Sequence, residues 1–279
     1  MARTLALRIL AAAIGLATTA TLAGCSSGGG GSAPTNTATG TGKLTIGIAD
    51  DEPGVSAKAG TGYQGFDIDT AAYIAGKLDV PTENITWKPL DPGERIAALE
   101  NGQVDLVVAT FSITPDREKQ LTFSKPYFVA HQDLLIRRND DSITGPETLD
   151  GKTLCAATGT TSADYVKAHY KGKITLREVP TFSECVRDLA NGDVDAVSTD
   201  DLILAGFAAQ PEYKGLLKVV GKGFTDETYG VGIKKGDTAM ADKVNAALAD
   251  YISSGAWKKS LDTWVAPSGY HVPSPPAVG

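Results

Sequence analysis

The sequence has few residues of the kinds that bind metal ions, and its basic residues, the kind that binds nucleic acid, are outnumbered by acidic ones. Its 279 residues include only three His and three Cys, which leaves little material for a metal site. Basic residues are the minority, with 26 Lys and Arg against 33 Asp and Glu and a formal net charge of -7. Affinity for nucleic acid or for anionic membranes comes from basic residues, so this composition disfavours both as general partners. Phosphate-cradle and zinc spacings are absent, and no cofactor is implied.

The rest of the composition is typical of a globular protein. Hydrophobic residues make up 42% of the chain and charged residues 21%, which argues against collagen-like, coiled-coil or wholly disordered chains. The length is sufficient for one large core or for two compact ones.

The N-terminal segment has the pattern of a secretory signal. Arg3 and Arg8 precede the apolar, small-residue run 9–22, which ends close to Cys25. The run is shorter than the 18 or more apolar residues of a membrane span. It resembles a bacterial lipoprotein signal, which implies that residues 1–24 are removed and that Cys25 is lipidated. A plain signal with a chance cysteine is the alternative.

Two further segments have the composition of non-globular chain. Residues 25–42, rich in Ser, Gly and Thr, are expected to form a flexible tether behind the lipid. Residues 267–279 are rich in Pro and are expected to form an extended tail. A lipid, a tether and a folded body predict an extracytoplasmic protein whose contact with the membrane is the lipid anchor only.

The remaining cysteines fit the same compartment. If Cys25 carries lipid, Cys155 and Cys185 remain as a pair in an oxidising space, and we expect a disulfide between them. Two buried free thiols are the alternative.

From residue 43 onward, strand-like and helix-like patterns alternate, which predicts an α/β fold. Expected strands cover 43–48, 104–109, 153–156, 174–179 and 196–198. Expected helices cover the segment after a turn at 62–65, then 94–101, 162–169, 183–191, 202–210, 239–253 and 256–265.

One segment recurs in the chain. Residues 95–110 return as residues 185–200, with a Leu, an Asn-Gly pair, a Val-Asp pair and a further Val at matching positions. Each copy predicts a helix, an Asn-Gly stop suited to a left-handed helix end, and a buried strand. Two similar α/β lobes are the simplest explanation. Open α/β sheets bind ligands beyond the carboxyl ends of their strands, where Thr110 and Asp200 lie, so we expect the site in a cleft between the lobes.

The residues around these strand ends suit a small zwitterion. Ser112 and Arg117 follow Thr110, and a guanidinium offers a carboxylate paired donors. Thr160 and Thr161 open a helix, whose free N–H groups favour an anion, and Asp200 could pair with an ammonium group. Each residue also has a plainer interpretation: a surface charge for Arg117, an ordinary helix cap for the Thr pair, and a cap of the next helix for Asp200. Together they predict an α-amino acid as ligand.

The order of five short motifs extends this interpretation over residues 43–265. The chain resembles the polar amino-acid-binding proteins of ABC importers, and within them the glutamate/aspartate-binding branch, through the motifs at 65–69, 112–117, 123–127, 159–162 and 195–200. The resemblance implies a two-lobed, type II periplasmic-binding-protein fold with two hinge strands, near 130–137 and 224–233. The first lobe would comprise 43–133 and 229–266, and the second lobe 134–228.

The resemblance also implies a role for each residue of the cleft. Arg117 and the backbone at Ser112 and Thr161 would hold the α-carboxylate. Asp200, the Thr110 carbonyl and the Ser112 hydroxyl would hold the α-ammonium group.

Arg95 is the candidate for selectivity. It opens a helix facing the cleft and would bind a side-chain carboxylate, with the Thr160 hydroxyl as helper; a solvated helix charge is the plainer alternative. The usual aromatic lid is missing from the first loop, so Tyr63, Phe111 or Tyr229 would cover the ligand. The acidic run 50–52 would repel a dicarboxylate unless it points away.

The sequence thus predicts a monomeric lipoprotein that captures glutamate or aspartate and delivers it to the permease and ATPase subunits of an ABC importer. A sensory protein with a signalling partner is the first alternative. A secreted enzyme on the same scaffold is the second, although no catalytic arrangement can be argued from the scattered His131, His169 and His271.

Overall fold

The computed structural model describes residues 42–170 and 172–277. The predicted signal 1–24, the lipidation site Cys25 and all of the tether except residue 42 lie outside the described residues. Within the described part of the chain, no helix combines the length and the apolar character needed to cross a membrane.

The first lobe is built on a five-stranded sheet. Its strand order is β5 (Ile85–Pro89), β1 (Leu44–Ile48), β6 (Leu106–Val107), β15 (Gly232–Lys234) and β7 (Leu121–Phe123). β1 runs parallel to β5 and β6, whereas β15 runs antiparallel to β6 and β7. The expected strand 104–109 is therefore too long: the segment is mostly buried, but only Leu106–Val107 forms a strand.

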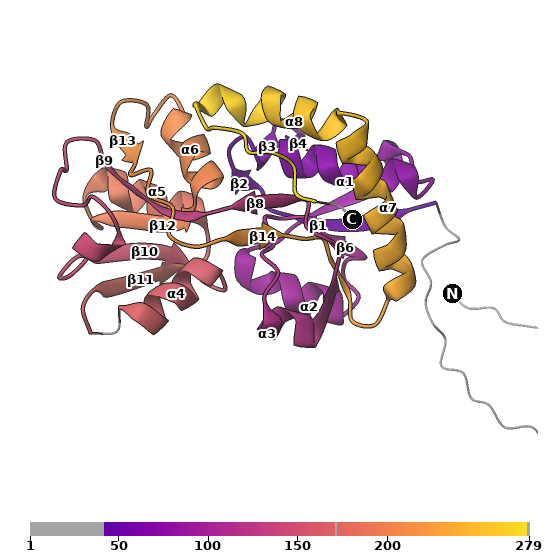
Figure 1. Ribbon diagram of the computed structural model, residues 1–279, viewed down its shortest axis with the longest axis horizontal. Coiled ribbons are helices and arrows are strands. Elements are labelled where there is room, and N and C mark those ends of the chain that lie inside the picture. The colour runs from indigo at the N-terminus through magenta and orange to yellow at the C-terminus, as the bar shows by residue number, and fades with distance from the viewer. Residues whose placement is uncertain (1–41, 171, 278–279) are drawn as a thin grey trace, which may run out of the picture. The chain divides into compact units, whose positions relative to one another are not determined.

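Helices from both ends of the chain cover this sheet (Figure 1). They are α1 (Phe66–Lys77), α2 (Arg95–Glu100), α3 (Pro115–Gln120), α7 (Thr238–Ser253) and α8 (Ala256–Trp264). α1 packs against both α7 and α8, so the C-terminal helices complete the first lobe. Short 3₁₀ helices occupy Thr82–Asn84, Pro92–Glu94, Pro146–Thr148 and Ala266–Ser268.

A small antiparallel sheet was not expected from the sequence. It consists of β2 (Asp51–Glu52), β3 (Ser56–Ala59) and β4 (Gly62–Gln64). The segment 62–65 is thus mainly a strand of a hairpin and not a simple turn. This sheet contains the end of the acidic run 50–52 and packs on α1.

The second lobe has a sheet of the same plan. Its strand order is β11 (Thr175–Val179), β10 (Thr153–Ala157), β12 (Ala196–Asp200), β9 (Gln132–Arg137) and β13 (Leu217–Val219). Its helices are α4 (Thr161–His169), α5 (Phe182–Asn191) and α6 (Asp201–Ala209). β10 pairs in parallel with β11 and β12, as β1 does with β5 and β6 in the first lobe.

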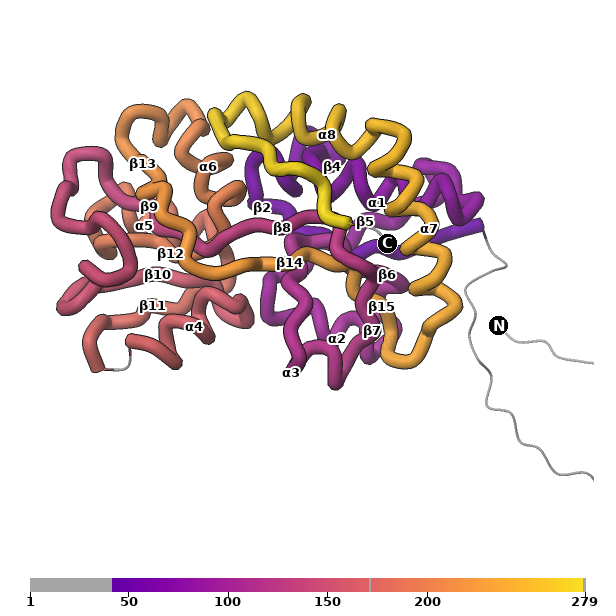
Figure 2. Tube along the Cα trace, viewed as in Figure 1, coloured from indigo at the N-terminus to yellow at the C-terminus, as the bar shows by residue number. Residues whose placement is uncertain are grey.

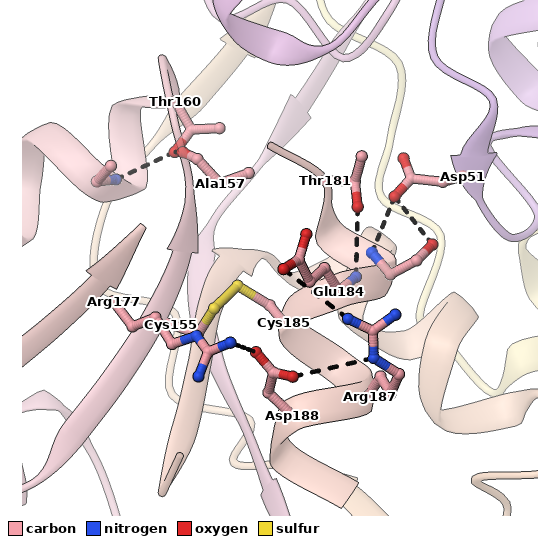
Figure 3. The surroundings of a disulfide bond; sticks show 12 residues. Asp51, Cys155, Ala157, Thr160, Arg177, Thr181, Glu184, Cys185, Arg187 and Asp188 are labelled. Carbon is pink, nitrogen blue, oxygen red and sulfur yellow. Dashed lines mark hydrogen bonds and ion pairs between the residues drawn. A yellow bond between two sulfur atoms is a disulfide. The ribbon is translucent and has the colours of Figure 1, made fainter. Parts of the chain in front are cut away.

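The repeated segment has the same structure in each lobe. In both copies a helix is followed by a glycine with positive φ, 65° at Gly102 and 89° at Gly192, and then by a central strand. Cys185 of the second copy forms a disulfide with Cys155 of β10, with a Cα–Cα distance of 5.5 Å (Figure 3). The disulfide predicted from the cysteine count is present.

Two strands form the hinge. β8 (Phe128–Ala130) and β14 (Glu227–Tyr229) pair antiparallel and lie side by side in Figures 1 and 2. The predicted hinge range 130–137 is displaced, because it shares only Ala130 with β8 and otherwise covers β9 of the second sheet. The range 224–233 contains β14 but is too wide, because it extends into β15 of the first sheet. The lobe boundaries at 133/134 and 228/229 remain a prediction.

The C-terminal segment does not simply extend away from the body. After α8 it runs back along the molecule (Figure 2), and the Tyr270 hydroxyl shares its one hydrogen between the two carboxylate oxygens of Asp201, each at 3.1 Å. Tyr270 and Val272 also pack against the core. The described part of the predicted tail is therefore docked.

Candidate ligand-binding cleft

Side chains from both lobes surround a small cavity at the ends of β6 and β12. Its volume is about 10 Å³, roughly the room for one water molecule, so the cleft is closed in this structure. The lining residues are Arg95, Thr110, Ser112, Arg117, Thr160, Thr161, Ser162, Phe182, Thr199, Asp200 and Ile203. They include every residue predicted to bind ligand except Phe111.

Arg95 is buried, with 4% of its surface exposed, which excludes a solvated helix charge. Its Nε donates to the Pro92 carbonyl at 2.9 Å and its Nη1 to the Ala109 carbonyl at 2.8 Å, both within the first lobe. Its Nη2 lies 3.5 Å from the carbonyl oxygen of Gly159 in the second lobe. One edge of the guanidinium is thus fixed, and the other is presented across the cleft.

Arg117 is arranged in the same way. α3 begins behind Thr114, whose hydroxyl accepts the Arg117 N–H at 3.2 Å. The guanidinium donates from Nη1 to the Ser112 carbonyl at 2.7 Å and from Nη2 to the Gly159 carbonyl at 3.0 Å. Two guanidinium groups therefore converge on one acceptor in the second lobe.

Phe111 supports both guanidinium groups. The Cζ atom of Arg95 lies 4.5 Å from the centre of its ring and that of Arg117 lies 4.9 Å away, and such cation–π contacts favour a charged guanidinium in a fixed position. Burial and the neighbouring Arg117 lower the pKa of Arg95 to about 9, while Glu52 and Asp200 act in the opposite direction. Arg95 therefore stays charged at neutral pH.

The apolar wall of the cavity comes from the second lobe. Tyr63, Phe111 and Tyr229, considered as lid residues, are not among the lining residues, whereas Phe182 and Ile203 are. Phe182 is the first residue of α5 and Ile203 lies in the first turn of α6. Neither belongs to a recognisable motif, so only the packing of these helices against the cleft reveals them.

The start of α4 lies at the cavity. The first N–H groups of a helix have no partner within the helix, and here they follow Thr160 and Thr161 at the cavity. The Thr160 hydroxyl caps α4 by accepting the Ala163 N–H at 3.1 Å, and it donates to the Ala157 carbonyl at 2.7 Å. Because its one hydrogen is used there, this hydroxyl has none left for a ligand carboxylate, and the expected helper role is not supported.

Asp200 lies opposite the arginines at the end of β12. It is 5% exposed and accepts a hydrogen bond of 2.5 Å from the Tyr229 hydroxyl. Although Asp200 is the N-cap residue of α6, its side chain makes no capping hydrogen bond in the described structure. Burial, and then the neighbouring Glu227, raises the pKa of Asp200 to about 8. An approaching ammonium group would favour the ionised carboxylate.

Two buried acids behind Thr110 were not predicted as site residues. Thr110 has a φ of 45°, a left-handed conformation that is rare for a β-branched residue. Its N–H donates to Asp67 Oδ2 at 2.7 Å, and its hydroxyl donates to Glu52 Oε1 at 3.0 Å. Burial raises the pKa of Asp67 to about 7 and that of Glu52 well above its usual range. Glu52 lies in the acidic run 50–52 and Asp67 in the motif 65–69, but neither pattern predicts that the two acids meet at Thr110.

The acidic run 50–52 separates in space. Glu52 turns into the first lobe toward Thr110, and Asp51 accepts hydrogen bonds from Ser183 of the second lobe. Neither residue lines the cavity. Among the described residues, no group of His, Cys, Asp or Glu is suited to hold a metal ion.

Two lobes, two hinge strands and a closed polar cleft between them define a binding protein of the type II periplasmic class. The chain belongs to the bacterial extracellular solute-binding proteins, family 3, whose sequence profile matches residues 44–267. It is therefore an amino-acid-binding protein of the ABC importer type, and its family and relatives are solute-binding proteins rather than enzymes.

Relatives differ in the amino acid for which they are named. The chain is 39% identical over 233 residues to the glutamate-binding protein GluB of Corynebacterium efficiens, covering 79% of this chain and 78% of the relative. It is 32% identical over 226 residues to the glutamine-binding protein GlnH of Bacillus subtilis, covering 80% and 81%. A solved ancestral arginine-binding protein bound to arginine is similar with a TM-score of 0.75 and 35% identity, covering 80% of this chain and 98% of that one.

Proposed function

We propose that this protein binds glutamate, or aspartate, between its lobes and delivers it to the permease of an ABC importer. The observation that carries the proposal is the pair of buried guanidinium groups that face one acceptor across the cleft, opposite a buried carboxylate. Glutamate has two carboxylates and one ammonium group, which matches in number the two guanidinium groups and the one carboxyl group of Asp200, whose ionised form the ammonium group would favour.

The backbone end of the ligand is assigned to Arg117 and Asp200. The guanidinium of Arg117 and the free N–H groups at the start of α4 would hold the α-carboxylate from the two lobes. Asp200, the Thr110 carbonyl and the Ser112 hydroxyl would receive the α-ammonium group. Such a ligand contacts both lobes only in the closed form, and it therefore shifts the population toward closure.

The distal end is assigned to Arg95. Its Nη2 edge points toward the second lobe while Nε and Nη1 are held by the first. A ligand carboxylate is a stronger acceptor than an amide oxygen for such a donor, which favours glutamate over glutamine. The cationic side chain of an arginine ligand would be repelled by Arg95.

Binding must displace the contacts to Gly159. A cavity of about 10 Å³ cannot contain an amino acid, so the lobes must separate slightly as the ligand enters. The N–H groups that meet the Gly159 carbonyl would then be transferred to the carboxylates of the ligand.

The lipid anchor at Cys25 is part of this proposal. Cys25 lies outside the described residues, and the support for its lipidation is the signal-like segment before it. Replacement Cys25→Ser should release the protein from the membrane fraction of a producing bacterium. Retention of that variant at the membrane would contradict the anchor.

Calorimetric titration with the twenty standard amino acids tests the ligand assignment. We expect glutamate or aspartate to bind with a Kd in the micromolar range, about -8 kcal/mol, and more tightly than glutamine or arginine. Glutamine bound as tightly as glutamate would overturn the assignment.

A further inference from the structure

The lobes meet at a second place, away from the arginines. There the carboxylate of Asp51 in β2 of the first lobe accepts two hydrogen bonds from Ser183 of the second lobe. The Ser183 N–H donates at 2.8 Å and the Ser183 hydroxyl at 2.9 Å, both to Oδ2 of Asp51, which is labelled in Figure 3 with a dashed line for each bond.

Ser183 is the second residue of α5, so Asp51 caps a helix that belongs to the other lobe. The cap residue of the helix itself, Thr181, accepts the Glu184 N–H at 3.3 Å. The free N–H groups of the first turn are thus shared between one acceptor in each lobe. A carboxylate at this end also interacts favourably with the helix dipole.

The capped helix is connected to the binding cleft. Phe182, directly before Ser183, lines the cavity, and Cys185 one position beyond Glu184 ties α5 to β10 through the disulfide. Because the helix is fixed to its own sheet, Asp51 cannot reposition it alone. A contact at its first turn instead joins the two lobes directly beside Phe182 of the cavity wall.

A close backbone contact adjoins this cap. Pro53 follows β2, and a Cβ atom at Gly206 of α6 would lie 2.0 Å from its carbonyl oxygen. The small sheet of the first lobe therefore fits closely against both α5 and α6 when the cleft is closed. Burial raises the pKa of Asp51, while the donors of Ser183 act in the opposite direction.

We propose that Asp51 is a positioning residue for ligand capture, which caps α5 only in the closed form and thereby slows release of a ligand that it does not touch. The inference takes the identity of the ligand from the proposed function, whereas the contact between Asp51 and Ser183 does not depend on that function. Opening the cleft breaks both hydrogen bonds to Ser183, so their loss should act on the dissociation rate.

The test is a stopped-flow measurement of glutamate dissociation from four proteins. Asp51→Ala should raise the dissociation rate by about tenfold, the effect expected of a lost charge-assisted contact. Asp51→Asn, which keeps an acceptor oxygen, should restore at least part of the slow release. A residue with a merely structural role would change stability without this pattern.

Asp50→Ala is the matched control beside the wild type. It removes the same charge from the same acidic run, but among the described residues the Asp50 side chain makes no hydrogen bond across the cleft. We expect its dissociation rate to stay within about twofold of the wild type. An unchanged rate in Asp51→Ala, or an equal rise in Asp50→Ala, would overturn the proposal.

A preceding titration separates this inference from the proposed function. If the wild-type protein does not bind glutamate, the proposed ligand is wrong, and the same four proteins are compared with glutamine or arginine. If Asp51→Ala fails to fold, Ser183→Ala provides the comparison: it removes one of the two donors and should raise the rate by a few-fold. No change in that variant would count against the cap.

Discussion

The two buried arginines owe their orientation to backbone carbonyl groups. Pro92 and Ala109 hold two N–H groups of Arg95, and Ser112 holds Arg117. These acceptors lie in the first lobe, so the side chains are oriented before a ligand enters. Pre-oriented donors lose little freedom on binding, and this favours a rigid, charge-selective contact.

Replacement of Arg95 by Ala should separate acidic from amide ligands. Glutamate affinity should fall at least about tenfold, because a charge-assisted hydrogen bond is lost, while glutamine affinity changes little. Calorimetry with both ligands measures the effect, and a thermal melt of Arg95→Ala checks that the protein remains folded. Equal losses for both ligands would show that Arg95 does not bind the side chain.

Asp200 should make binding depend on pH. Its pKa of about 8 means that the carboxyl carries a proton at neutral pH, and a ligand ammonium group favours loss of that proton. Glutamate affinity should therefore rise as the pH increases, by at least about tenfold between pH 6 and pH 8.

Titrations in buffers of different ionisation enthalpy would detect the released proton. Asp200→Asn cannot release it and should show little pH dependence over this range. A pH-independent affinity in the wild-type protein would contradict the protonation of Asp200.

At the scale of elements, the repeated helix–strand unit has a structural explanation. Asp105 accepts the Thr45 N–H at 2.7 Å, and Asp195 accepts the Thr153 N–H at 2.8 Å. In each lobe the Asp therefore fixes the start of the neighbouring strand. The shared Val-Asp pair of the sequence reflects this common architecture and not a second ligand site.

The close approach of Gly159 to the first lobe should be required for closure. A Cβ atom at Gly159 would lie 2.5 Å from the Cα atom of Gly93, so Gly159→Ala should keep the lobes further apart than the slight separation that a bound ligand requires. We expect glutamate and glutamine to lose affinity by similar factors of about tenfold or more, unlike in Arg95→Ala.

Gly151→Ala is the control for backbone strain. Both glycines have a φ of 79°, but a Cβ atom at Gly151 would meet no described atom within 4 Å. Calorimetry on the two variants separates strain from closure. Equal affinities in Gly159→Ala and Gly151→Ala would contradict the role of the contact.

The disulfide should stabilise the second lobe. Cys155 and Cys185 are 30 residues apart, and closing a loop of that length is worth about 3–4 kcal/mol in the unfolded chain. The double variant Cys155→Ala with Cys185→Ala should lower the free energy of unfolding by about that amount, as measured in urea. If the free energy of unfolding fell by less than about 1 kcal/mol, as for an ordinary substitution without a disulfide, the stabilising role would be contradicted.

At the scale of the whole molecule, the sequence predicts the lobes well because their signals are local. Each repeated segment, 95–110 and 185–200, contains the pattern of a helix, an Asn-Gly stop and a buried strand within 16 consecutive residues. The grouping of Arg117 with Asp200 was also predictable, since ligands bind beyond the carboxyl ends of the strands in open α/β sheets. Only the family resemblance implied that Arg95 joins them.

Features that depend on contacts between distant segments were not predictable. The hinge pairs β8 with β14, almost 100 residues later, and no local pattern marks where each strand leaves its sheet. Phe182 and Ile203 reach the cavity only because α5 and α6 pack against it. Glu52 and Asp67 support Thr110 from two separate elements, so their role follows from tertiary structure.

A crystal structure of the protein with bound glutamate tests the central claim most directly. We expect Arg117 to bind the α-carboxylate, Asp200 the ammonium group, and Nη2 of Arg95 the distal carboxylate, with the contacts of both arginines to the Gly159 carbonyl lost. A ligand whose distal carboxylate lies beyond hydrogen-bond distance of Arg95, or a cleft without glutamate, would contradict the account.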